Sequence, residues 1–74
     1  MDRLKINTIN YMVVCINEFA GKFNLSIKEA YKYLENYGAL RFLLENYEIE
    51  HTLGIEDAIE DLTTICNKNG GYLN

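Results

Sequence analysis

A chain of 74 residues is long enough for one domain and no more. Hydrophobic residues make up 49% of it, which excludes a disordered chain, and the absence of proline and of period-2 alternation favours helices over strands. The formal net charge of −4 is uneven, because residues 1–44 carry +2 and residues 45–74 carry −6. The acidic half would repel nucleic acid and attract a basic protein surface.

The first predicted helix covers about residues 3–21 and ends over residues 21–24. Its main apolar stripe recurs at spacings of three and four and consists of Ile9, Met12, Val13, Ile16, Phe19, Ala20 and Phe23. Tyr11, Val14 and Cys15 extend this surface around the side. Such a helix is either central to the fold or partly covered by another chain. Both readings stay open for these three residues, and for Tyr33 further along: burial by folding alone, or an interface with a protein partner or a second copy.

The second predicted helix begins at a capping box and runs to about residue 36. The Ser26 hydroxyl can accept from the backbone amide of Glu29, while the Glu29 carboxylate accepts from the amide of Ser26. Gly38 suits the left-handed position just past this helix, and a third helix covers about residues 39–46. The residues expected to be buried are Ile27, Ala30, Tyr31 and Leu34 in the second helix, and Leu40, Leu43, Leu44 and Tyr47 in and after the third.

The fourth predicted helix begins after Gly54 and ends at Gly70 and Gly71, with residues 70–74 expected to fray. Its apolar stripe consists of Ile55, Ala58, Ile59, Leu62, Ile65 and Cys66. Four acidic residues face away from the stripe: Glu56, Asp57, Glu60 and Asp61. The helix dipole favours only the first two. A solvated face is the ordinary explanation of this excess, and a docking surface for a basic partner is the alternative.

The single histidine, His51, lies between the third and fourth predicted helices. A zinc site needs about four ligands, and nucleophilic catalysis needs a base, a nucleophile and an orienting group; neither pattern surrounds His51. We expect a joint in which His51 or Thr52 satisfies backbone groups near the start of the fourth helix, with a partner contact as the alternative. We therefore expect no catalytic residue, cofactor or metal.

Cys15 and Cys66 are too few and too far apart for a disulfide framework, and each falls in an apolar helical pattern. We expect both to be reduced, in a cytoplasmic protein without a secretion signal. The longest apolar run, residues 11–16, is too short to span a bilayer.

A helix-turn-helix reading is the alternative to a protein-binding module. The second helix would then present Ser26, Lys28, Glu29 and Lys32 to DNA, or the third would present Arg41 with Glu45 opposing it. DNA-binding helices usually gather a basic stripe for the phosphates, and neither helix has one. Binding to nucleic acid is therefore disfavoured.

The chain resembles a family of short bacterial proteins classed only as a domain of unknown function. The resemblance rests on CINEFA at residues 15–20, LS at 25–26, EAY at 29–31, YGAL at 37–40, and Tyr47 followed by His51 and Thr52. Genes of that family often lie beside genes for ADP-ribosyltransferase-like toxins, which implies an antitoxin or accessory role. Together with the patterns above, this predicts an all-α bundle of about four helices over residues 1–74 that binds a protein and is not an enzyme.

Overall fold

The chain folds into helices joined by short connections, and no strand occurs within residues 3–71. The computed structural model describes the backbone of residues 3–71 and the side chains of residues 7–71. The helices are α1 (Arg3–Phe23), α2 (Ile27–Asn36), α3 (Ala39–Glu45), α4 (Tyr47–Glu50) and α5 (Ile55–Lys68). The prediction of a small all-α bundle is confirmed, with one short helix, α4, that was not predicted.

The first helix continues through Gly21 and ends at Phe23, within the predicted stretch 21–24. Asn24 takes the left-handed conformation (φ 56°), and the amide of Leu25 donates to the carbonyl of Ala20 over 2.8 Å. This is the hydrogen bond of a Schellman motif, in which the left-handed residue is usually glycine and sometimes asparagine. Asn24 therefore ends the helix, and Gly21 does not.

The capping box at the start of α2 is present as predicted. The backbone amide of Glu29 donates to Ser26 Oγ over 3.1 Å, and the amide of Ser26 donates to Glu29 Oε1 over 2.8 Å. The hydrogen bonds to Ser26 lower the pKa of the Glu29 carboxyl. Gly38 is left-handed (φ 77°), also as predicted, and turns the chain from α2 into α3.

Asn46 separates α3 from α4. Its backbone amide and its side-chain amide both donate to the carbonyl of Phe42, over 3.0 and 2.9 Å. Competition of this kind between an asparagine side chain and the helical backbone favours a break. The chain then makes the single turn of α4 before α5 begins at Ile55.

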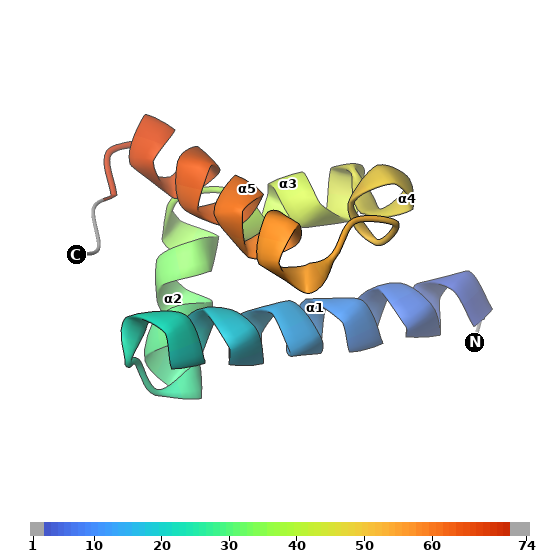
Figure 1. Ribbon diagram of the computed structural model, residues 1–74, viewed down its shortest axis with the longest axis horizontal. Coiled ribbons are helices and arrows are strands. Elements are labelled where there is room, and N and C mark those ends of the chain that lie inside the picture. Colours follow the sequence, from blue (N-terminus) through green and yellow to red (C-terminus); the bar gives the residue numbers. More distant parts are fainter. Residues whose placement is uncertain (1–2, 72–74) are drawn as a thin grey trace.

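The core lies between α1, α2, α3 and α5. In Figure 1, α1 runs along one side, α3 and α5 lie on the other, and α2 stands across the C-terminal half of α1. The buried apolar side chains are Cys15, Ile16, Phe19 and Ala20 of α1, Ala30 and Leu34 of α2, Ala39, Leu40 and Leu43 of α3, and Ala58, Ile59, Leu62 and Cys66 of α5. The stripe predicted for α5 therefore faces the core, with Ile55 and Ile65 at its edge.

Ile27 and Tyr31, which were predicted to be buried, are exposed, and so are Ile9 and Val13 of the α1 stripe and Leu44 of α3. On α2 the neighbouring helices cover the side that carries Ala30 and Leu34, so the adjoining side with Ile27 and Tyr31 stays open. Gly71, predicted to fray, is buried, and its amide donates to the carbonyl of Cys66 over 2.8 Å. Residues 72–74, the rest of that predicted frayed end, lie outside the described residues.

Candidate interaction surfaces

An apolar groove runs between α1 and α2 and has a volume of about 450 Å³. Its lining is almost entirely apolar and comes from Val13, Ile16 and Asn17 of α1 and from Ile27, Lys28 and Tyr31 of α2. Ile9 lies one helical turn before Val13 and extends the surface along α1. Ile9, Val13, Ile27 and Tyr31 are each 46–52% exposed. We call this surface the α1–α2 groove.

Two charged residues border the groove on α2. Lys28 lines it directly, and Glu35 hydrogen-bonds with the Tyr31 hydroxyl, which raises the pKa of that hydroxyl. The groove therefore carries a positive charge near the start of α2 and a negative charge near its end.

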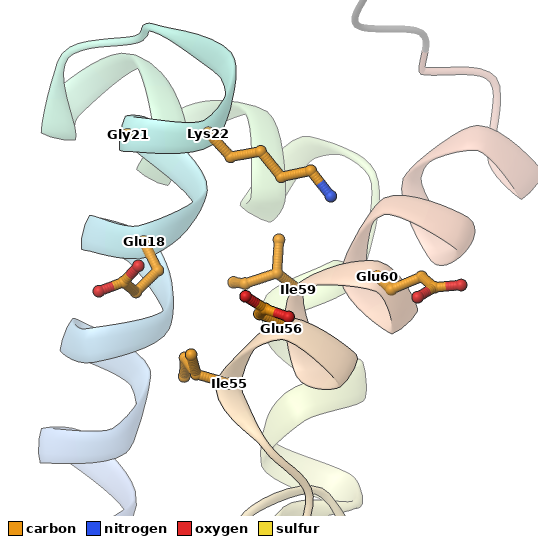
Figure 2. Close-up of a pocket in the computed structure, with 7 residues that line it drawn as sticks. All are labelled: Glu18, Gly21, Lys22, Ile55, Glu56, Ile59 and Glu60. Carbon is orange, nitrogen blue, oxygen red and sulfur yellow. The ribbon is translucent and has the colours of Figure 1, made fainter.

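A second cleft lies between the last turns of α1 and the first turns of α5 (Figure 2). Ile55 and Ile59 point from α5 toward α1, and the Lys22 side chain extends from α1 toward α5. The cleft is about 450 Å³ in volume and is completed by Glu18, Gly21, Glu56 and Glu60. Its apolar wall is short, and charges of both signs surround it.

The four acidic residues predicted as one face of the last helix fall into separate environments. Glu56 and Glu60 border the α1–α5 cleft, and Figure 2 shows the Glu60 carboxylate turned away from α1. Asp57 is exposed and does not line the cleft, whereas Asp61 is half-buried. Of these four acids, Glu56, Asp57 and Glu60 therefore offer exposed negative charge to a partner.

Asp61 meets a buried carboxyl group that sequence reasoning missed. Glu50 is only 4% exposed, and its Oε1 atom has no hydrogen-bond partner. Burial, together with the hydrogen bond and negative charge of Asp61, raises the pKa of Glu50 to about 7. Glu50 lies three residues after half-buried Tyr47, so the two residues share a face of a helical turn. This spacing could have predicted the burial of Glu50 only if α4 had been predicted to be helical.

Tyr11 ties α1 to this same turn. Its hydroxyl donates to the backbone carbonyl of Glu50 over 2.9 Å, and its ring packs edge-on against Tyr47 at 5.6 Å. Burial, with smaller contributions from Cys15, Glu50 and Tyr47, raises the pKa of the Tyr11 hydroxyl. Half-buried Tyr11 therefore acts chiefly as an internal anchor for α4.

The other residues of the predicted α1 surface separate from Tyr11. Cys15 is completely buried, so it presents no surface to a partner and is withdrawn from the predicted interface. Its neighbour Val14 is 47% exposed, but it does not line the α1–α2 groove. Successive residues of a helix are rotated by roughly 100°, so the Val14 side chain points away from the groove that Val13 lines.

Tyr33 packs mainly inside the fold. Its ring stacks on Phe19 at 5.9 Å and lies against Tyr37 at 4.8 Å. Its hydroxyl is buried beside Gly71, where an added Cβ would come within 2.6 Å of the oxygen. The packing thus explains Tyr33 without a partner.

His51 is the exposed end of the α4 turn. Its ring stacks on Tyr47 at 4.5 Å, and its Nδ1 donates to the carbonyl of Tyr47 over 2.7 Å. Next to it, the Thr52 hydroxyl donates to the carbonyl of Ile49 over 2.6 Å. The predicted joint is confirmed, but both side chains satisfy carbonyls at the end of α4 and not groups at the start of the last helix.

The two cysteines are free and buried in the core. Burial raises the pKa of each thiol to about 11, which disfavours the reactive thiolate form. Among the described side chains, no three His, Cys, Asp or Glu residues come together as a metal site. Within residues 3–71, none of the helices has the length and apolar character needed to cross a bilayer.

These features define a small all-α protein with an open apolar groove between two helices. Residues 10–69 match the family model described as "Protein of unknown function (DUF3791)", and the chain belongs to that family. No curated protein and no solved structure matches the chain.

Proposed function

We propose that this protein is a non-enzymatic protein-binding module and that the α1–α2 groove is its binding surface. The observation that carries the proposal is the clustering of Ile9, Val13, Ile27 and Tyr31, four large apolar side chains that are each about half exposed. Contiguous exposed apolar surface on a small protein marks an interaction site far more often than isolated apolar residues do. Covering it with another protein removes the unfavourable contact with water.

A capture experiment tests this function. The tagged chain is expressed in its native host, and captured proteins are quantified by mass spectrometry for wild type, Ile27→Glu and Ile49→Glu. Ile27 lines the groove, whereas Ile49 is an exposed isoleucine on α4 and serves as the matched control. We expect one partner set for wild type and Ile49→Glu and its loss with Ile27→Glu. Equal capture by Ile27→Glu contradicts the proposal.

We further propose an antitoxin-like accessory role in the cytoplasm, with the exposed acids of α5 contacting a basic surface on a toxin. The family resemblance supplies the expectation of a neighbouring toxin, and the free buried cysteines fit a reducing compartment. Co-expression with a gene for an ADP-ribosyltransferase-like toxin tests this role through host growth. The double variant Glu56→Lys with Glu60→Lys should no longer rescue growth. Undiminished rescue of growth would contradict the proposed acidic contact.

The DNA-binding alternative receives no support from a specific feature. On α2, Lys28 and Lys32 are accompanied by Glu29 and Glu35, so the helix has no basic stripe.

A further inference from the structure

We infer that the α1–α2 groove is covered by a second copy of this chain, in a two-fold dimer that packs α2 antiparallel against α2. This inference rests on the proposed function, because it names the partner of the same groove. Two observations lead to it: the apolar residues of α2 that stay exposed, and the arrangement of opposite charges beside them.

The exposed face of α2 combines an apolar row with a charged end on each side. Ile27 and Tyr31 are one turn apart and both line the groove. Lys28, Tyr31 and Glu35 follow one another at spacings of three and four, so they share a face of the helix. All four side chains are exposed. Along the chain, this face therefore carries positive Lys28, then Tyr31, then negative Glu35, with exposed Lys32 at its edge.

That order is complementary to itself when the helix is reversed. A two-fold axis places each residue of one helix opposite the residue equally far from the axis in the second copy. With the axis midway between residues 28 and 35, Lys28 faces Glu35 of the second copy, and symmetry forms the pair twice. Tyr31 lies beside the axis, where its ring contacts the second copy.

The balance of charge favours a second copy over a strongly basic or strongly acidic protein. A basic protein would be repelled by Lys28 and by exposed Lys32, and an acidic protein would be repelled by Glu35, whereas the antiparallel copy pairs Lys28 with Glu35 twice. The pairs mainly fix orientation, and the apolar contact supplies the affinity.

The area that a stable dimer buries determines which helices must take part in the contact. A stable interface buries about 800 Å² on each partner, roughly a sixth of the 5074 Å² accessible surface of this chain. Ile27 and Tyr31 alone are too small for that. Ile9 and Val13 on α1 continue the same apolar surface, so the dimer contact has to include α1 as well.

Sedimentation equilibrium on the full chain tests the dimer directly, over micromolar to millimolar concentrations. The variants are Lys28→Glu, Glu35→Lys and the double variant, with Glu48→Lys as a charge-reversal control at an exposed position of α4. Circular dichroism checks that each variant is folded. Wild type and the control should dimerise alike. Each single reversal should weaken the dimer roughly tenfold, and the double reversal should restore it.

Mixing the two single variants gives the sharpest result. A dimer of one Lys28→Glu chain with one Glu35→Lys chain has two attractive pairs, so the mixture should associate more tightly than either variant alone. A monomeric wild type, unaffected single variants or a mixture without gain would each overturn the inference. If wild type is monomeric while Ile27→Glu still loses its captured partner, the groove binds a different protein, and the proposed function survives without the dimer.

Discussion

The carboxyl group of Asp61 on α5 lies close to the buried carboxyl group of Glu50 on α4 and helps to raise its pKa. Glu50 is buried and its pKa is raised to about 7, so near neutral pH its carboxyl exists partly as the neutral acid. A protonated carboxyl can donate to its neighbour, whereas two ionised carboxylates repel each other. Folding therefore favours the protonated form of the Glu50 carboxyl group.

The first prediction is that this proton makes stability depend on pH. A carboxyl whose pKa rises from 4.5 to about 7 on folding stabilises the fold fully below pH 4.5. That contribution is lost as the pH rises through 7, and it amounts to about 3 kcal/mol. Glu50→Gln removes the titration, so its free energy of unfolding relative to wild type should increase between pH 4.5 and pH 7.

Urea denaturation of both proteins across this pH range measures the difference. The matched control is Glu48→Gln, which removes an exposed carboxylate from the same short helix. A constant difference between Glu50→Gln and wild type at every pH would show that the buried carboxyl does not titrate with folding.

The second prediction concerns the anchor between α1 and α4. Tyr11→Phe deletes the hydroxyl that donates to the carbonyl of Glu50 over 2.9 Å but keeps the ring packed against Tyr47. The free energy of unfolding should fall by about 1 kcal/mol. Amide hydrogen exchange should accelerate in residues 47–53 more than in α2. Uniform acceleration across both regions would argue against a local anchor.

The third prediction compares two glycines. At Gly71 an added Cβ would lie 2.6 Å from the Tyr33 hydroxyl oxygen and 2.8 Å from Tyr37 Cδ2, so Gly71→Ala forces these rings apart. We expect a loss of about 1–3 kcal/mol in the free energy of unfolding. At Gly21, inside α1, nothing lies within 4 Å, and Gly21→Ala should stabilise the helix by up to about 1 kcal/mol. Thermal denaturation that ranked the two variants in the opposite order would contradict this packing.

Local signals predicted much of the fold. The Ser26–Glu29 capping box and left-handed Gly38 fix both ends of α2, and each depends on residues close together in the sequence. The apolar stripe of α5 was likewise predicted from local spacing, and it faces the core. The end of α3 at Glu45 lies within one residue of its predicted end, whereas the short helix α4 was not predicted.

The candidate site was harder to predict than the fold. Periodicity showed that Ile27 and Tyr31 share a face with Ala30 and Leu34, but not how far the neighbouring helices cover that face. The prediction therefore placed Ile27 and Tyr31 in the core, and the groove between α1 and α2 was not predicted. Glu50 was missed for the opposite reason, since a charged residue is rarely expected to be buried.

The most direct test of the central claim is a dilution series followed by amide nuclear magnetic resonance. If the α1–α2 groove is covered by another copy, dilution should shift the signals of Val13, Ile27 and Tyr31 and leave those of Ile49 and Thr52 unchanged. Signals that stay constant at every concentration, or shifts confined to the acidic residues of α5, would contradict it.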